Sequence, residues 1–285
     1  MGGHPVRPLI APLATAAAGE LAGLEARVVL SDVTKLANLV HDVTVGLGAD
    51  VAVAEFGSLW DLEAIGIELD WSMGAPRARP VRAVRRDGGD LRTHGRGPVV
   101  LEAVRRLRGV LGDRAVVAAG VTGPETLAEA SGLPPADAAR VALAAARHLC
   151  DAGAQIVWVV ETLDRPAETG TPTTSMTSVW GTIRFYGALG VLHVGGRDGW
   201  VDYVAAGGPY VCCFDPDRAP ALDALVADSR VAFALALPLG PPTSAAARLG
   251  RSGGCVLVTN DSELAGRVPA RELRGAVEDL RAATI

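Results

Sequence analysis

The stretch Gly190–Gly196, with the sequence GVLHVGG, has the length and apolar character of a short, fully buried strand. It carries one histidine, His193, and it ends in two glycines. In a barrel of parallel strands, a polar residue at the carboxyl end of a strand lies at the mouth, where the chemistry takes place. His193 is therefore our first candidate for a catalytic residue, and the other strands decide which groups it meets.

Apolar runs of strand length recur along the chain, and longer helical patterns follow them. The predicted strands are Pro8–Leu13, Val51–Glu55, Ala115–Val121, Gln155–Glu161, Val191–Val194, Pro209–Phe214, Val231–Leu237 and Cys255–Asn260. The predicted helices are Thr34–Leu47, Pro98–Leu111, Pro135–Ala152, Thr177–Leu189, Gly199–Ala206, Ala219–Ala227, Thr243–Leu249 and Pro269–Ala283. This alternation predicts an α/β fold, a single-domain (β/α)8 TIM barrel over residues 1–285. No G-x-G-x-x-G follows the first strand and no P-loop is present, so we expect no nucleotide cofactor.

Composition excludes several classes of function. Of the 285 residues, 49% are apolar and only 4% aromatic, which suits a parallel sheet covered by helices. The formal net charge is −5 with both signs interspersed, so we expect no nucleic-acid partner. No apolar run is long enough for a signal peptide or a membrane span, which predicts a cytoplasmic protein without membrane attachment. In that reducing compartment the four cysteines are expected to be free thiols.

The predicted strand ends carry the side chains that chemistry needs. We predict acid–base roles for His193, Glu161 and Glu55. The residues predicted to bind a small-molecule substrate are Thr122, Trp60, Asp164 and Asp215. The residues predicted to bind a metal are His193, Cys212, Cys213 and Asp261.

Each candidate also has a structural alternative. Glu55 or Glu161 can cap a helix N-terminus or pair with an arginine, and Asp215 precedes a predicted helix that it can cap. Because side chains alternate along a strand, only one of Cys212 and Cys213 can face the barrel interior.

Four segments, in order and at matching spacing, resemble the uroporphyrinogen decarboxylase superfamily, and within it the corrinoid-linked methyltransferase branch. Asp50–Trp71 is similar to the family's second strand with the helix that follows it. GVTGPETL at Gly120–Leu127 resembles the loop after strand three, and DAGAQIVWVVETL at Asp151–Leu163 resembles strand four. LHVGG at Leu192–Gly196 resembles the "LH-x-CG" of strand five. The resemblance implies a barrel that holds its substrate in the mouth.

In the methyltransferase branch, the resemblance further implies a zinc ion that binds a thiol and a methyl group delivered by a corrinoid on a partner protein. His193 matches the family's histidine ligand, but Gly195 stands where its first cysteine is expected. The second cysteine's position falls at about Asp261 or Ser262, and Cys255 lies too early in its strand to replace it. The arginine-rich segment of the true decarboxylase is replaced by Ile10–Gly19.

Two chemistries and one binding role therefore stay open. A zinc ion held by His193, Cys212 or Cys213, and Asp261, with Glu161 nearby, would support methyl transfer. Without a metal, His193 with Glu55 and Glu161 would move a proton in a decarboxylation or another lyase reaction on a small carboxylic acid. A non-catalytic barrel that binds a tetrapyrrole or a partner protein is the third hypothesis. We rank methyl transfer first, and a homodimer is among the assemblies that we allow for.

Overall fold

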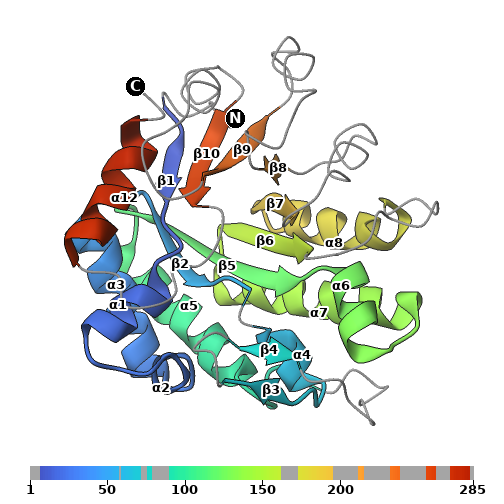
Figure 1. The fold of residues 1–285 in the computed structure, drawn as a ribbon. Helices are drawn as coiled ribbons and strands as arrows, with labels where there is room; N and C mark the ends of the chain where they lie inside the picture. Colours follow the sequence, from blue (N-terminus) through green and yellow to red (C-terminus); the bar gives the residue numbers. More distant parts are fainter. Residues whose placement is uncertain are drawn as a thin grey trace.

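The chain forms a (β/α)8 barrel of eight parallel strands with helices outside them (Figure 1). The computed structural model describes residues 7–57, 59–71, 76–78, 90–161, 173–194, 211–214, 232–237, 255–260 and 270–282. The barrel strands are β1 (Leu9–Ala11), β2 (Val51–Glu55), β5 (Val116–Thr122), β6 (Ile156–Glu161), β7 (Leu189–Val194), β8 (Val211–Phe214), β9 (Phe233–Leu237) and β10 (Cys255–Asn260). Their order around the sheet is β1-β10-β9-β8-β7-β6-β5-β2, and every pair is parallel. The predicted barrel is confirmed.

The helices of the described chain run on the outside of this sheet. They are α1 (Thr15–Leu21), α2 (Ala26–Leu30), α3 (Val33–Leu47), α4 (Trp60–Ala64), α5 (Gly97–Leu111), α6 (Pro124–Ser131), α7 (Pro135–Ala152), α8 (Thr173–Phe185) and α12 (Ala270–Ala282). The apolar pattern did not predict the short helices α1, α2 and α6, and the predicted helix Thr177–Leu189 begins four residues after the start of α8. Helix α4 lies in Asp50–Trp71, where the resemblance implied a helix after the second strand. The predicted helices Gly199–Ala206, Ala219–Ala227 and Thr243–Leu249 lie outside the described residues. No helix in the described part of the chain is long and apolar enough to cross a membrane.

The long helices begin and end at residues that local chemistry favours. Asp32 caps α3, because its carboxylate accepts hydrogen bonds from the backbone N–H groups of Thr34 (2.9 Å) and Lys35 (3.0 Å). Helix α7 has Pro135 at its first position, and Gly153 follows its last residue. Gly153 has a φ of 101°, a backbone conformation that glycine adopts with little strain because it has no Cβ.

The barrel closes between β1 and β2 through Asp50 rather than through a strand ladder. The backbone N–H of Asp50 donates to the carbonyl of Ile10 (3.1 Å), and its carboxylate accepts from the N–H of Ile10 (2.9 Å). Arg7 donates two hydrogen bonds to the same carboxylate, at 2.7 and 2.8 Å. Asp50 thus joins the first and second strands through both its backbone N–H and its carboxylate.

Two apolar layers, one on each face of the barrel wall, build the core. The outer layer packs the strands against the helices and includes Leu36, Leu107, Val117, Leu149 and Val157. The inner layer fills the barrel and consists mainly of Ala11, Val51, Val53, Ala118, Ile156, Trp158, Val160, Val191, Val211, Cys213, Ala234, Ala236 and Leu257. Much of the inner layer is alanine and valine, and Trp158 is its largest side chain. A small hairpin, β3 (Leu69–Asp70) with β4 (Arg77–Ala78), adds a separate two-stranded sheet.

Candidate functional site

Strand alternation decides which predicted site residues face the barrel interior. On β6, Trp158 and Val160 belong to the inner layer, whereas Val157 and Val159 belong to the helix side. Glu161, the next residue, therefore points away from the interior. On β7, Val191 belongs to the inner layer, so His193, two residues further, shares that side.

His193 lies between two aromatic rings inside the barrel. Its ring centroid is 5.0 Å from that of Phe56, at an interplanar angle of 84°, and 6.3 Å from that of Trp158. Phe56 and Trp158 also contact each other edge to face, at 5.4 Å and 88°. Burial lowers the pKa of His193 to about 4, so the imidazole is neutral near pH 7. A neutral imidazole offers one N–H donor and one acceptor nitrogen.

Two nitrogens of this aromatic group lack hydrogen bonds. Nδ1 of His193 and Nε1 of Trp158 are both buried, and neither has a hydrogen-bond partner among the described residues. His193 is 5% exposed and Trp158 is 0% exposed. Neither Phe56 nor Trp158 was predicted as a site residue.

Glu55 was predicted to act beside His193, and its neighbour Phe56 contacts the His193 ring. The register between β2 and β5 shifts between Val53 and Glu55, so that Glu55 pairs with Ala119, a residue of the helix-side layer. The extra residue turns Phe56 toward Trp158 and His193. Glu55 is buried (3% exposed) directly after this register shift.

Glu161 holds the N-terminus of α6, which is the structural alternative to its predicted catalytic role. Its carboxylate accepts hydrogen bonds from the backbone N–H groups of Glu125 (3.1 Å) and Thr126 (2.8 Å) and from the Thr126 hydroxyl (2.5 Å). Gly123 leaves room for this arrangement, since a Cβ there would overlap the carboxyl group. Burial outweighs the hydrogen bonds and raises the pKa of Glu161 to about 7.

The predicted substrate contacts Trp60 and Thr122 instead join α4 to β5. The Trp60 indole N–H donates to the carbonyl of Gly120 (2.9 Å), and the ring is 1% exposed. Thr122 donates both its backbone N–H and its hydroxyl to Asp61, each at 2.6 Å. Asp61 is fully buried, and burial raises its pKa. The polar groups of both predicted contacts are therefore used within the wall of the barrel.

The adjacent cysteines face opposite sides of the wall. Cys213 is in register with His193 and belongs to the inner layer, whereas Cys212 is in register with Leu192 of the helix-side layer. Burial raises the pKa of Cys212 to about 12 and that of Cys213 well above its ordinary value. Both thiols are therefore protonated near pH 7.

The described residues do not fit a zinc ion. No group of three or more His, Cys, Asp or Glu side chains within the described ranges is placed to hold a metal. Of the predicted ligands that the structure describes, His193 and Cys213 share the interior side, and a catalytic zinc needs three protein ligands. Asp261, like the predicted substrate residues Asp164 and Asp215, lies outside the described residues.

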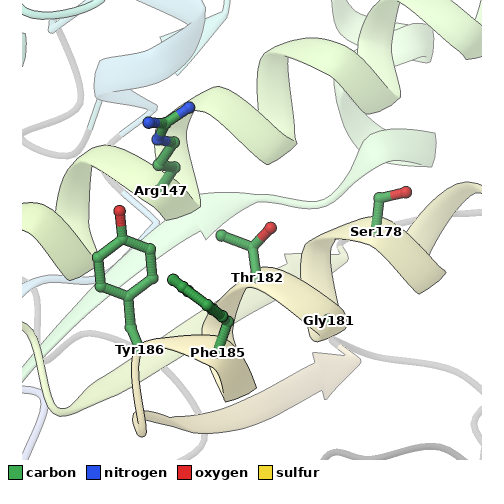
Figure 2. A pocket seen from close by; sticks show the side chains of 6 residues that line it. All are labelled: Arg147, Ser178, Gly181, Thr182, Phe185 and Tyr186. Carbon is green, nitrogen blue, oxygen red and sulfur yellow. The ribbon is translucent and has the colours of Figure 1, made fainter.

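A separate groove lies on the outer surface between α7 and α8. Its volume is about 300 Å³, and Figure 2 shows Arg147, Thr182, Phe185 and Tyr186 around it. Phe185 is 85% exposed. The Tyr186 hydroxyl donates to Asp151 (2.5 Å), which also pairs with Arg147 at 3.9 Å.

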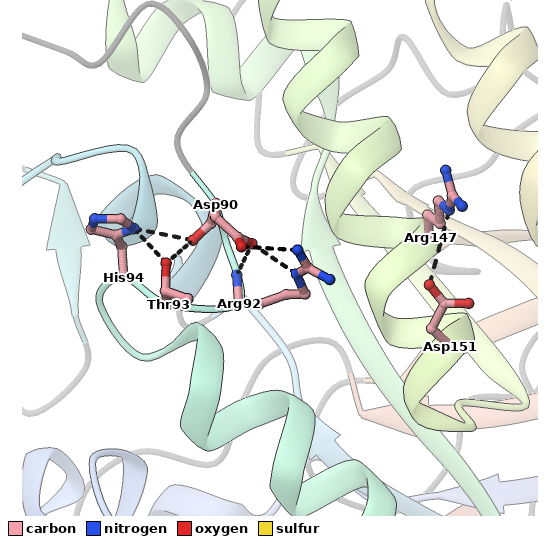
Figure 3. A network of polar contacts seen from close by, with 6 residues as sticks. All are labelled: Asp90, Arg92, Thr93, His94, Arg147 and Asp151. Atoms are coloured by element: carbon pink, nitrogen blue, oxygen red, sulfur yellow. Dashed lines mark hydrogen bonds and ion pairs between the residues drawn. The ribbon is translucent and has the colours of Figure 1, made fainter.

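The charged side chains near this surface form local pairs. In Figure 3, Arg147 faces Asp151 on α7, while Arg92 contacts Asp90 in a second group (Nε to Oδ1 2.9 Å). His94 completes that second group through a 3.1 Å contact of Nδ1 with the Asp90 carbonyl. These groups organise the turn before α5 and the end of α7, outside the barrel.

Comparison with known proteins agrees with the fold. A methyltransferase from Methanosarcina mazei superposes with a TM-score of 0.73 at 16% sequence identity, over 99% of this chain and 94% of that chain. A B12-independent methionine synthase from Shewanella sp. W3-18-1, in complex with selenomethionine, gives a TM-score of 0.55 at 10% identity, over 88% of this chain and 87% of that chain. No protein-family model and no curated protein sequence matches this chain. At these identities the likeness establishes the barrel fold.

Proposed function

We propose that this chain is a barrel enzyme that transfers a methyl group to or from a small molecule bound among Phe56, Trp158 and His193. The proposal is supported by the likeness of fold to a methyltransferase and a methionine synthase. It also agrees with the sequence resemblance to the corrinoid-linked branch. The observation that carries it is His193, a neutral buried imidazole near the carboxyl end of β7, where (β/α)8 enzymes bind and convert their substrates.

The surroundings of His193 suit a reaction that requires water to be excluded from the site. The aromatic rings of Phe56 and Trp158 cover the imidazole, and Val160 is its register partner on β6. In such a site every hydrogen bond to the reacting molecule is stronger than in water. His193 orients its ligand by donating or accepting one hydrogen bond. Because its pKa is lowered, the imidazole binds a proton only weakly near pH 7. We therefore propose that His193 positions the substrate and does not act as a general base.

The lyase alternative has less support in the described residues. It requires a carboxylate beside His193 to move a proton, and Glu161 instead binds the backbone of α6 on the other side of the wall. We therefore keep methyl transfer as the proposed reaction.

The test uses methylcobalamin as methyl donor, because the resemblance points to a corrinoid source. Purified protein is mixed with ¹³C-methyl-labelled methylcobalamin and a panel of small thiols, amines and alcohols, and labelled products are followed by NMR. We expect turnover with at least one acceptor, and about a hundredfold loss in His193→Gln. The matched control is His41→Gln on the surface of α3, which should keep full activity. Absence of turnover with every acceptor would contradict the proposal, and corrinoid binding without turnover would favour a non-catalytic barrel.

A further inference from the structure

Unpaired polar atoms are concentrated inside the barrel. In the described part of the chain, three buried side-chain atoms lack a hydrogen-bond partner: Nε1 of Trp158, Nδ1 of His193 and Oε2 of Glu20. The first two atoms belong to side chains on the neighbouring strands β6 and β7. The ring centroids of these two side chains are 6.3 Å apart. The third lies on α1, away from the barrel interior.

Two such atoms on adjacent strands require an explanation. A buried donor or acceptor without a partner destabilises a protein, and native cores contain few of them. Elsewhere in this barrel the chain satisfies its polar groups closely. Thr259 donates to the Ala11 carbonyl at 2.6 Å, and Asn260 exchanges hydrogen bonds of 2.7 and 3.1 Å with the backbone of Leu13. A ligand that pairs with both ring nitrogens would explain why these two are left open among the described residues of the inner layer.

We propose that Trp158 Nε1 and His193 Nδ1 are the two polar contacts of a site for a small uncharged group that carries one hydrogen-bond acceptor and one donor. The indole N–H can only donate, so the ligand presents an acceptor to Trp158. His193 Nδ1 accepts the ligand's donor when the imidazole proton is on Nε2. A secondary amide has this pattern, with the acceptor and the donor on two separate atoms that can reach two separate nitrogens. The inference rests on the proposed function for placing the substrate inside the barrel, and it adds the substrate's chemical class.

The preference for an uncharged ligand follows from the charges around the site. The carboxylates of Glu161 and Asp61 are engaged on α6 and β5, and the aromatic and thiol groups beside His193 among the described residues are Phe56, Trp158 and Cys213. The imidazole itself is neutral near pH 7. An anion or cation in this interior would lose its hydration without gaining an opposite charge from these groups.

The experiment measures binding rather than turnover. Wild-type protein labelled with ¹⁵N in its tryptophan and histidine rings is titrated with N-methylacetamide, which has one acceptor and one donor. We expect a saturable shift of the Trp158 indole N–H and the His193 ring signals. The internal control is the Trp60 indole, which is already bonded to Gly120 and should not move. N,N-dimethylacetamide, which lacks the donor, should bind about tenfold more weakly, since it loses one hydrogen bond.

Charged probes and one variant complete the test. Acetate and tetramethylammonium at the same concentrations should leave both signals unchanged, and Trp158→Phe should abolish the response of His193. If that variant does not fold, the relative affinities of the four probes for wild-type protein are sufficient to test the proposal. No saturable shift with N-methylacetamide, as expected if one water bridges the two nitrogens, would overturn the proposal, and so would an equal response to acetate. A saturable shift in a protein without methyl-transfer activity would support the proposed binding site and contradict the proposed reaction.

Discussion

Glu161 and Thr126 are joined by two hydrogen bonds, since Oε2 of Glu161 accepts both the backbone N–H (2.8 Å) and the hydroxyl (2.5 Å) of Thr126. The contact fixes the first turn of α6 to the end of β6. A carboxylate near a helix N-terminus is stabilised by the helix dipole and by the unpaired N–H groups there. In this barrel, then, a side chain at the carboxyl end of a strand supports the wall.

The buried carboxyl group predicts an unusual pH dependence of stability. Because burial raises the pKa of Glu161 to about 7, the folded protein holds this proton more tightly than the unfolded chain does. The contribution of Glu161 is therefore most favourable below its ordinary pKa of 4.5, and it declines as the pH rises to about 7. Replacement by glutamine removes the effect, so Glu161→Gln should gain roughly 2–3 kcal/mol relative to wild type between pH 5 and pH 8. Urea unfolding at both pH values measures this difference, and a difference that does not change with pH would contradict the account.

Gly123 should tolerate no side chain. A Cβ at this position would overlap the carboxyl group of Glu161, so Gly123→Ala must displace the hydrogen bonds to α6. We expect a loss of about 2–3 kcal/mol in the free energy of unfolding. The matched control is Gly109→Ala within α5, where nothing lies within 4 Å of the new methyl group and alanine should stabilise the helix by up to about 1 kcal/mol. Equal effects at the two glycines would show that Glu161 has no fixed place beside Gly123.

The junction between β1 and β2 should depend on the charge of Asp50. Burial opposes that charge, but the hydrogen bonds from Arg7 and Ile10 outweigh it and lower the pKa. The stabilisation is therefore present above the ordinary pKa and is lost as the pH falls through the lowered value. Asp50→Asn should cost about 1–2 kcal/mol at pH 7 and much less near pH 3. Asp42→Asn, at an exposed carboxylate, is the control and should change stability by less than about 0.5 kcal/mol at pH 7.

The indole of Trp60 should contribute through its N–H as well as its ring. Trp60→Phe keeps an aromatic ring in the core but leaves the carbonyl of Gly120 without this donor. We expect a loss of about 2 kcal/mol, from the unpaired carbonyl and the smaller ring together. Thermal unfolding measures it. If Trp60 contacted substrate instead of the wall, the variant would lose activity while keeping the wild-type melting temperature.

The alternation of strands and helices could be predicted from the sequence because the buried residues of each element form an apolar pattern. Strands β2 and β10 and helix α7 begin and end where the apolar pattern predicts them. The short helix α6 was missed because it begins two residues after the end of β5 and has only 8 residues. Helices of that length depend on tertiary contacts, such as those of Asp61 and Glu161, more than on their own sequence.

The site was harder to predict, because its geometry depends on the face that each side chain takes. Every residue of Ile156–Val160 is apolar, so the sequence contains no alternation to show on which face Glu161 lies. The register shift between Val53 and Glu55 likewise accompanies the packing of Phe56 against the inner layer, and no residue signals it. His193 was found because a lone histidine in an apolar strand is conspicuous. The sequence pointed to Trp158 less clearly. Its one distinguishing feature is that it is a large side chain with an N–H donor in a strand that is otherwise mostly valine.

The central claim is that His193 is a neutral, buried imidazole among Phe56 and Trp158, and NMR titration of its ring nitrogens tests this claim most directly. The signals are assigned by comparison with His193→Gln. The account predicts that the His193 ring stays neutral as the pH is lowered from 8 to 5 and gains its proton only near pH 4. Protonation of His193 near pH 6.5 in the folded protein would contradict the account, because the imidazole would then be in contact with water or with an acidic partner.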